Sequence, residues 1–388
     1  MIDETTPSAI LALTKSLIER ASVTPDDAGC QPVLADRLAK AGMRVESLRF
    51  GEVDNLFATL GEGSPHLLLL GHTDVVPPGP DHEWTSPPFA PEVRDGMLYG
   101  RGAADMKSSV AAFVLAAEQF ISTARRPKGR LSILLTSDEE GVAADGVRRV
   151  VPWLEAKKML PDHVLVGEPS STDRLGDVIR IGRRGSIQAR LTVVGEQGHT
   201  AYARGEDNPV HQVAPLLAAL TALEFDDGDE AFPPTRLQVS NLRAGTGADN
   251  VTPGRVEIMF NLRHNPNSTA EQLKNRVEVL LADHALPDCR LDWRISGAPF
   301  GPADGRLLHA VISAVRDRLN LDTRPDTGGG TSDGRFFGPL GIETVELGPV
   351  NRTIHKIDES IAVDDLARLP GLYLDVMERV LGRDGDPG

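Results

Sequence analysis

Two histidines and four acidic residues in this sequence stand where their side chains could hold metal ions. Each follows a short apolar run or lies in a glycine-rich segment, and the set comprises His72, Asp105, Glu139, Glu140, Glu168 and His355. A mixture of imidazole nitrogen and carboxylate oxygen donors suits zinc or a similar divalent ion. Two ions about 3.5–4 Å apart need one shared carboxylate and further ligands on each side. The set is large enough for such a dinuclear site.

The residues next to these candidates suggest how the work could be divided. Asp74 stands two residues after His72, so both side chains point to the same side of an extended chain. Its carboxylate could accept the second ring N–H of a metal-bound imidazole. The adjacent Glu139 and Glu140 point in different directions if their segment is extended. One could bind metal while the other acts as a general base, and nearby cations would relieve their repulsion.

Short apolar strands are predicted to deliver these side chains. The segments 66–76, 130–141 and 163–171 each begin as an apolar run and end in polar residues, glycine or proline. Helical patterns, such as the one at 107–124, separate them. Strands alternating with helices predict a mostly parallel α/β sheet. In such sheets, ligands bind in the loops after the carboxyl ends of the strands, which is where these polar clusters lie.

The middle of the chain has a different pattern. Between about 187 and 294, alternating strands and two helical stretches are typical of a separate α+β unit, and after 297 the α/β pattern resumes. A length of 388 residues also favours two domains. The sequence therefore predicts a discontinuous catalytic domain, 1–183 with 297–388, and an inserted domain, 184–296.

Composition restricts the class of partner and the compartment. The chain has 56 Asp and Glu against 41 Lys and Arg, a formal charge of −15, which argues against nucleic acid or an anionic membrane as partner. We expect no secretory signal and no transmembrane helix, because no apolar run approaches about 18 residues. The two cysteines, Cys30 and Cys289, lie far apart outside any CxxC motif, which fits a reducing cytoplasm. We therefore predict a cytoplasmic protein with a small-molecule partner.

Eight segments of the chain resemble the M20 metallopeptidase family. Four of them carry candidate ligands: GHTDVVPPG at 71–79, GRGAADMK at 100–107, TSDEEG at 136–141 and VGEPSS at 166–171. The others are similar to the desuccinylase branch of that family: GRRGS at 182–186, GHTAYA at 198–203, GGTSDGRF at 329–336 and GPVNRTIHKIDES at 348–360. The matches run from Gly71 to about Ser360.

The resemblance implies a metal-binding role for each matched ligand. His72 and Glu168 would hold one zinc ion, Glu140 and His355 would hold the other, and Asp105 would bridge the two, with a cis peptide bond after it. Co²⁺ could replace zinc at one of the sites. In the same family pattern, Glu139 would be the general base, and Asp74 would be the partner of His72.

The resemblance also implies a use for the inserted domain. It would be a lid and dimerisation domain of a homodimer, from which His199 donates a hydrogen bond to the oxyanion in the facing subunit. The substrate would be an N-succinyl amino acid, whose carboxylates suit the bidentate fork of arginine. Substrate contacts are expected from Arg183, Ser186, Tyr202, Asn250, Arg263, Thr331 and Asn351.

Several alternatives stay open at this point. Within the same fold, the chain could be an acetylornithine deacetylase, an aminoacylase or a dipeptidase. A metal-free binding or scaffold protein would lack a ligand or the base, and none is missing. A dinucleotide loop is not expected, because Asp105 occupies the place of the third glycine in G-x-G-x-x-G. A serine hydrolase, which carries its nucleophile in a sharp G-x-S-x-G turn, is not expected either.

Overall fold

The computed structural model describes residues 6–122 and 128–382, which form two compact units. Unit 1 contains the described residues up to Gly182, Gly301–Asp326 and those from Ser332 onward. Unit 2 contains Arg183–Phe300 and Thr327–Thr331, whereas the sequence placed the limits of the inserted domain at 184–296. A short piece of the glycine-rich segment before Ser332 therefore belongs to unit 2.

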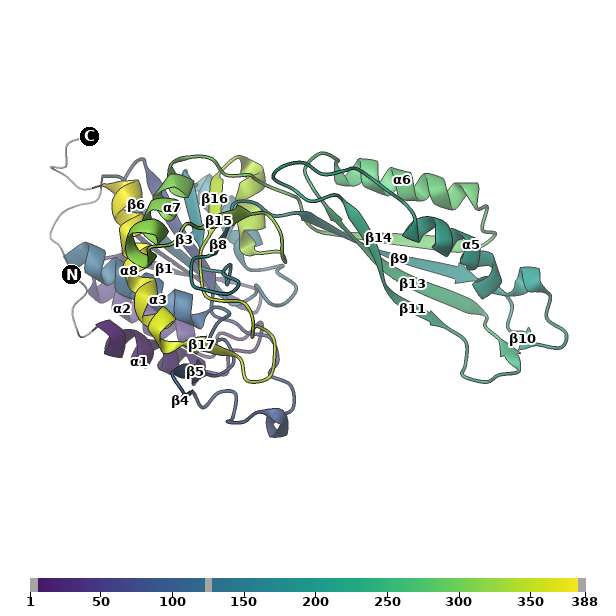
Figure 1. Ribbon diagram of the computed structural model, residues 1–388, viewed down its shortest axis with the longest axis horizontal. Coiled ribbons are helices and arrows are strands. Elements are labelled where there is room, and N and C mark those ends of the chain that lie inside the picture. The colour runs from purple at the N-terminus through teal and green to yellow at the C-terminus, as the bar shows by residue number, and fades with distance from the viewer. Residues whose placement is uncertain (1–5, 123–127, 383–388) are drawn as a thin grey trace. The chain divides into compact units, whose positions relative to one another are not determined.

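Unit 1 is built on an eight-stranded sheet (Figure 1). Its strands in spatial order are β1 (Arg44–Phe50), β2 (Val53–Gly61), β6 (Arg130–Thr136), β3 (His66–His72), β7 (His163–Val166), β16 (Glu343–Glu346), β8 (Val178–Arg180) and β15 (Arg324–Asp326). β3 runs parallel to both β6 and β7, and β16 runs parallel to β7. β1 and β2 pair antiparallel at one edge. The predicted mostly parallel sheet is confirmed.

Helices cover both faces of this sheet. They are α1 (Thr6–Ile18), α2 (Cys30–Lys40), α3 (Lys107–Ser122), α4 (Val147–Ala156), α7 (Arg306–Leu319) and α8 (Val363–Leu381). Alternate residues of β3 show the two layers, because Leu67 and Leu69 join the core beneath α1, α3 and α8, whereas Leu68 and Leu70 join the core beneath α4. Every residue of β3 is buried. Burial on both faces explains the unbroken run of leucines.

A small antiparallel sheet lies beside the large one in unit 1. Its strands in spatial order are β17 (Ser360–Ala362), β5 (Met97–Tyr99) and β4 (Glu92–Arg94). β17 follows the segment that carries His355, and β5 precedes the loop that carries Asp105. This pairing brings two segments together that are more than 250 residues apart in the chain.

Unit 2 is a four-stranded antiparallel sheet with two helices. Its spatial order is β11 (Arg236–Ala244), β13 (Arg255–His264), β9 (Gly185–Val194) and β14 (Cys289–Gly297), with a separate pair, β10 (Gly198–His199) and β12 (Val251–Thr252). α5 (Pro209–Thr221) and α6 (Ala270–Asp283) pack their apolar residues on the buried face of the sheet. A capping box of Thr269 and Gln272 starts α6.

Four single-turn helices complete the elements of the described residues: η1 (Asp81–Glu83), η2 (Gly205–Asp207), η3 (Asp333–Phe336) and η4 (Gly338–Leu340). None of the helices in the described part of the chain combines the length and hydropathy that a membrane span requires. Both cysteines are free, with Cys30 buried and Cys289 exposed.

Candidate metal centre

The candidate ligands of unit 1 meet at the carboxyl edge of the large sheet. His72 is the last residue of β3 and is paired in register with Thr136, the last residue of β6. Glu139 and Glu140 follow Thr136 in the next loop, and Glu168 follows β7 on the other side of β3. Because these three strands are parallel neighbours, their ends deliver all four side chains to one place.

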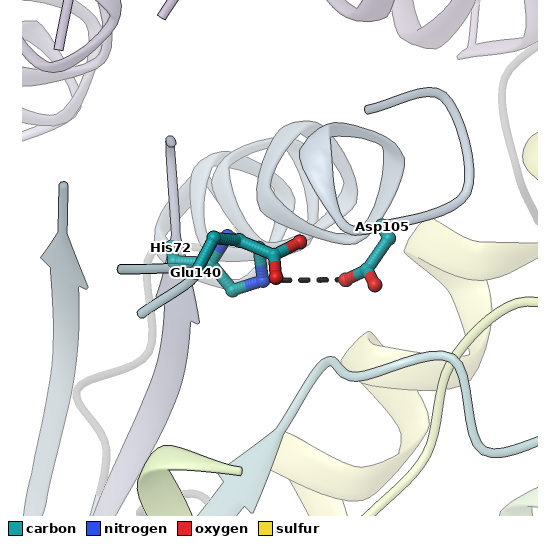
Figure 2. A group of neighbouring side chains, drawn as sticks. All are labelled: His72, Asp105 and Glu140. Carbon is teal, nitrogen blue, oxygen red and sulfur yellow. Dashed lines mark ion pairs between the residues drawn. The ribbon is translucent and has the colours of Figure 1, made fainter. Parts of the chain in front are cut away.

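Asp105 and His355 complete the group, and the distances divide it into two sets. The Nε2 atom of His72 lies 3.3 Å from Oδ1 of Asp105 and 3.6 Å from Oε1 of Glu168. The Nε2 atom of His355 lies 3.3 Å from Oδ2 of Asp105 and 3.0 Å from Oε1 of Glu140. The two oxygens of Asp105 therefore face different imidazoles, as a bridging carboxylate requires. Figure 2 shows Asp105 opposite His72 and Glu140.

The protonation equilibria of the two histidines reflect the surrounding acids. Burial alone would lower the pKa of His72, but the carboxylates of Asp105, Glu168 and Asp74 raise it well above its usual value. Contacts with Asp105 and Glu140 raise the pKa of His355 to about 10. Negative charge thus gathers around both imidazoles.

The carboxylates of this group lie close enough to repel one another. Burial, and then the charges of Asp105 and Glu139, raise the pKa of Glu168 well above its usual range. Burial opposes ionisation of Asp105 as well, but the imidazoles of His355 and His72 lower its pKa. A cluster of this kind is relieved by cations.

The donor atoms fit divalent ions. Nε2 of His72 and Oδ1 of Asp105 are buried without a hydrogen-bond partner, although they lie 3.3 Å apart. Two groups of three donors, His72 with Asp105 and Glu140, and His72 with Glu139 and Glu168, each have ligand atoms within 4.8 Å of one another. A metal ion would bind both of these atoms. Without it, each would be a buried polar atom without a partner, which destabilises a folded protein.

The loop before α3 carries Asp105 in a tightly determined conformation. The peptide bond between Asp105 and Met106 is cis, as the family resemblance implied. Gly102 has a φ of +84°, and a Cβ atom there would lie only 2.6 Å from Cγ1 of Val75. Glycine is therefore required at position 102 both by the backbone conformation and by the space.

Asp74 contacts this site in two ways. The Nδ1 atom of His72 lies 2.9 Å from the backbone carbonyl of Asp74, while the Asp74 carboxylate lies 3.6 Å from the same nitrogen. The carboxylate instead accepts the backbone N–H groups of Glu139 and Glu140, at 3.3 and 3.0 Å. Asp74 thus contacts the His72 ring through its backbone carbonyl, whereas the sequence predicted a contact through its carboxylate. The carboxylate holds the loop of Glu139 and Glu140 instead.

Two further residues lie next to Glu139 and received no role from the sequence. Nη1 of Arg335 is 4.0 Å from Oε1 of Glu139, and its Nη2 is 3.5 Å from Oδ1 of Asp333. Burial raises the pKa of Asp333 to about 6, against the lowering effect of Arg335. Burial, and then Asp333, raise the pKa of Glu139 well above its usual value. The sequence feature that could have indicated them is an acidic and a basic residue, Asp333 and Arg335, two positions apart in a glycine-rich segment.

The segment 330–334 reads G-x-S-x-G, a match that the prediction against a serine hydrolase overlooked. Ser332 at its centre is fully buried, and its hydroxyl donates to the carboxylate of Glu346. Its backbone is extended, with φ −132° and ψ 169°, rather than in the strained turn of a nucleophile elbow. The match carries no nucleophile, so the conclusion against a serine hydrolase stands on this geometry.

Three of the predicted substrate residues lie together in unit 2. Arg183 donates from Nη1 to the carbonyl of Gly328 at 2.8 Å, and Arg263 donates from Nη1 to Oγ1 of Thr331 at 3.1 Å. Burial, and then the charges of Arg184 and Arg183, lower the pKa of Arg263. Arg184 was not predicted, although it is the neighbour of Arg183 in GRRGS. Three guanidinium groups this close form a site of positive potential.

Two others, Tyr202 and Asn250, lie at the short β10–β12 pair of unit 2, together with the predicted oxyanion donor His199. The N–H of Thr200 donates to the carbonyl of Asn250 at 3.0 Å, and the N–H of Tyr202 donates to the carbonyl of His199 at 2.9 Å. The rings of His199 and Tyr202 lie 5.6 Å apart, and Tyr202 is 86% exposed. Nδ1 of His199 accepts the N–H of Ala201 at 3.1 Å. In the neutral ring, Nε2 therefore carries the hydrogen and can donate it.

Ser186 and Asn351 are the remaining predicted substrate residues. Ser186 is buried in unit 2, where its hydroxyl accepts from the amides of Asn261 and Gln188. It is paired in register with Arg263 across β9 and β13. Asn351 belongs to unit 1, and its backbone N–H donates to the carbonyl of Ser171 at 2.9 Å. Their predicted role as substrate contacts stays a prediction.

Comparison with protein families matches residues 68–379 to peptidase family M20/M25/M40. The chain belongs to this family. The match covers the sheet edge with all six candidate residues as well as the whole of unit 2. The family resemblance predicted from the sequence is confirmed.

Relatives in the M20/M25/M40 family include proteins with closely similar sequences. A succinyl-diaminopimelate desuccinylase of Xanthomonas oryzae pv. oryzae is 55% identical over 372 residues, which cover 96% of this chain and 99% of that protein. A succinyl-diaminopimelate desuccinylase of Stenotrophomonas maltophilia is 54% identical over 374 residues, covering 96% of this chain and 100% of that protein.

Solved structures of the family share the fold at low identity. A metallo-carboxypeptidase of the M20 family from Sulfolobus solfataricus has a TM-score of 0.80 at 15% identity and covers 98% of this chain and 99% of its own. A dinuclear metal binding peptidase of the M20 family from Bacillus subtilis has a TM-score of 0.71 at 16% identity, covering 98% and 100%. The M20 peptidase fold predicted from the sequence is thus confirmed.

Proposed function

We propose that this protein is a metal-dependent amide hydrolase that cleaves N-succinyl-LL-2,6-diaminopimelate to succinate and LL-2,6-diaminopimelate. The observation that carries the proposal is the 55% identity, over 96% of the chain, to relatives named succinyl-diaminopimelate desuccinylase. This identity favours the desuccinylase over the alternatives of the same fold, an acetylornithine deacetylase, another aminoacylase or a dipeptidase. The product would enter diaminopimelate and lysine biosynthesis.

Two zinc ions per subunit are the proposed cofactors. His72 and Glu168 would hold one ion, Glu140 and His355 the other, and Asp105 both, in line with the two sets of short distances. Imidazole and carboxylate donors suit zinc, and we also propose that Co²⁺ can replace it at one site. When bound, such ions supply Lewis acidity, which polarises the amide carbonyl and makes a water molecule acidic near neutral pH.

Glu139 is the proposed general base. Its carboxylate belongs to the same cluster as His72 and Glu168, but it is not needed to give each ion a histidine and a carboxylate. It would take a proton from the attacking water and deliver it to the amine nitrogen that leaves. Arg335, whose Nη1 lies 4.0 Å from Oε1 of Glu139, favours the charged form of the base.

The arginine group of unit 2 is the proposed site for substrate carboxylates. The substrate carries three of them, and an overall charge of −15 offers such an anion no general attraction. The guanidinium groups of Arg183 and Arg263, with Thr331 beside them, supply the local positive charge. Ser186, Tyr202, Asn250 and Asn351 are the further proposed contacts.

We further propose that the protein is a homodimer in which His199 of one subunit donates to the oxyanion in the other. The acceptance of an N–H at Nδ1 of His199, which leaves the ring hydrogen on Nε2, supports the donor role. The edge strands β11 and β14 are largely exposed, with Leu242 at 49% and Ile295 at 53%, so a second copy could cover them. A cytoplasmic location is also proposed, which the two free cysteines support.

The substrate proposal is tested by comparing two amides. Protein reconstituted with zinc is expected to hydrolyse N-succinyl-LL-2,6-diaminopimelate with a far higher kcat/KM than N-acetylornithine. The reason is that the succinyl compound has three carboxylates for the arginine group, whereas N-acetylornithine has one. Faster turnover of the acetyl compound would instead support the deacetylase alternative.

The position of His199 is tested by complementation between inactive subunits. In an equal mixture of Glu139→Ala and His199→Ala subunits, about half of the dimers are hybrids. If His199 acts across the interface, each hybrid has one intact site, so about a quarter of the wild-type activity returns. If His199 acts within its own subunit, no site is intact and no activity returns. Light scattering on the wild type measures the oligomeric state directly.

A further inference from the structure

A buried glutamate outside the candidate ligand set holds the loop of Asp105. Oε1 of Glu359 accepts the backbone N–H groups of Ala104 and Asp105, at 2.9 and 3.0 Å. Oε2 accepts the N–H of Gly102 at 3.0 Å and Nη1 of Arg101 at 2.7 Å. Both charged side chains are almost fully buried, with 1% of Glu359 and 2% of Arg101 exposed. Four donors from one loop thus converge on a single carboxylate.

The same glutamate lies in the segment that carries His355. It follows His355 by four residues, and its own backbone carbonyl accepts the N–H of Gly100 at 2.9 Å. Nη1 of Arg101 also donates to the carbonyl of Lys356 at 3.1 Å, within the same segment. His355 has a φ of +60°, which is unusual for a residue other than glycine. A conformation of this kind persists only where the surroundings hold it.

We propose that Glu359 is a positioning residue that ties the loop of Asp105 to the segment of His355 and so determines how tightly the two metal ions are bound. Glu359 acts through the backbone of Asp105 and is not itself placed among the ligand atoms. The Asp105 carboxylate must present one oxygen to each imidazole, at 3.3 Å in both cases, which leaves little tolerance for movement of its backbone. Arg101 donates to the buried carboxylate at 2.7 Å, which favours its charged form and orients it.

The chemistry explains why a carboxylate is needed at position 359. All four groups that converge on it are donors, and an ionised carboxylate accepts at both oxygens. In Glu359→Gln, one oxygen becomes an NH₂ group, which would face either Ala104 and Asp105 or Gly102 and Arg101. Two of the four hydrogen bonds are then lost, and the loop of Asp105 is released on that side.

The experiment measures metal affinity rather than activity. Protein is stripped with a chelator, its thermal unfolding is recorded, and Zn²⁺ is then titrated by calorimetry. Glu359→Gln is expected to weaken binding by about 10- to 100-fold, as for other residues that orient metal ligands. The matched control is Glu343→Gln, because Glu343 likewise accepts two backbone N–H groups, from Leu307 and Leu308. It also contacts His163, but neither strand β16 nor the first turn of α7 carries any of the proposed ligands.

The outcomes separate positioning from general stability. Both variants are expected to lower the unfolding temperature of the stripped protein, but only Glu359→Gln should weaken Zn²⁺ binding. Equal weakening by Glu343→Gln, or wild-type affinity in folded Glu359→Gln, would overturn the inference. If Glu359→Gln does not fold, Glu359→Asp replaces it, because it keeps the charge but withdraws the carboxylate. It is expected to weaken binding by about tenfold, and unchanged affinity would overturn the inference.

This inference rests on the proposed metal site but not on the proposed substrate. A wild-type protein that takes up no divalent ion would overturn the metal site and the role of Glu359 together. A wild-type protein that binds two ions, with a Glu359→Gln variant that binds them equally well, would overturn the role of Glu359 alone. Either result leaves the substrate comparison unaffected.

Discussion

The two ends of strand β3 carry the same residue type in surroundings that shift its pKa in opposite directions. His66 at the amino end is buried, its Nε2 lies 2.8 Å from the hydroxyl of Ser132, and its Nδ1 lies 3.3 Å from the carbonyl of Leu160. Burial, and then Arg130, lower the pKa of His66 to about 4. His72 at the carboxyl end is equally buried, yet the acids around it raise its pKa well above the usual value.

The difference shows what turns a buried histidine into a candidate ligand. Both rings terminate the same apolar strand and both are buried, so burial does not distinguish them. His66 meets neutral oxygens and is held as an uncharged core residue. His72 meets carboxylates from the ends of β6 and β7, and from the loop before α3, because parallel strands end at one edge.

The largest effect is expected when each of the two histidines is replaced by asparagine in a separate variant. His72→Asn should lose bound metal. Its kcat/KM should fall by at least about 10²–10⁴-fold, the decrease that removal of a general base causes, because the metal chemistry fails as well. His66→Asn should keep both metal and activity, and should only lower the free energy of unfolding. Metal analysis and kinetics on the two purified variants check this. Metal loss in His66→Asn would mean that the two ends of β3 are coupled.

Glu139→Gln sharpens the assignment at the carboxyl end. Turnover should fall by about 10²–10⁴-fold, because the proton acceptor is lost, while the metal content stays at the wild-type level. The neighbouring variant Glu140→Gln is the matched comparison, and it should lose metal together with turnover. If Glu139→Gln lost metal and Glu140→Gln did not, the two glutamates would have exchanged roles.

The amino end of β3 is expected to make stability depend on pH. The pKa of His66 is about 4 in the folded protein and about 6.5 when unfolded, so the unfolded chain binds more protons between these values. The stabilisation is therefore complete above about pH 6.5 and is lost as the pH falls toward 4. Between pH 7 and pH 5 the loss attributable to His66 is about 2 kcal/mol.

The measurement for this prediction is urea unfolding of wild type and His66→Gln at both pH values. Glutamine does not titrate. The difference in the free energy of unfolding between the two proteins therefore separates the effect of His66 from that of the groups around His72, whose pKa values are raised. That difference should shrink at pH 5. A difference that grows at pH 5 would show that the folded protein favours the charged ring.

The smallest effect is expected from the hydroxyl beside His66. Ser132→Ala should lower the free energy of unfolding by about 1 kcal/mol, because it removes a partner from Nε2 of His66 and from Oγ1 of Thr59. Metal binding should stay unchanged. Ser122→Ala, at an exposed helix end, is the control and should change stability by less than about 0.5 kcal/mol. A stronger effect on metal binding than on unfolding would contradict the separation of the two ends.

The contacts of individual residues show which parts of the site could be predicted from the sequence. The strand ends that carry His72, Glu139 and Glu168 were predicted, because apolar runs and the polar residues after them are local patterns. The side-chain role of Asp74 was predicted from its spacing, but the carboxylate reaches the N–H groups of Glu139 and Glu140 on another strand end. Such a partner, more than 60 residues away, leaves no local trace.

The glycine-rich segment before Ser332 shows the same limit. Its residues Thr327–Thr331 group with unit 2, whereas Ser332 and the residues after it group with unit 1. The sequence placed the whole segment in the catalytic domain, because the α/β pattern resumes after residue 297. The position of Arg335 beside Glu139 depends on how η3 packs against strands β3 and β7, which no spacing reveals.

The sequence by itself determined the element types, the mostly parallel sheet and the identity of the residues able to bind metal. Those properties follow from periodicity and side-chain chemistry, which act over a few residues. Only the tertiary structure decided that His72 becomes part of a charged cluster while His66 becomes a neutral core residue. Only the fold, likewise, decided that Glu359 anchors Asp105. The physical reason is that both outcomes depend on which distant carboxylates and N–H groups the fold brings within about 3–4 Å, where electrostatic and hydrogen-bond energies become large.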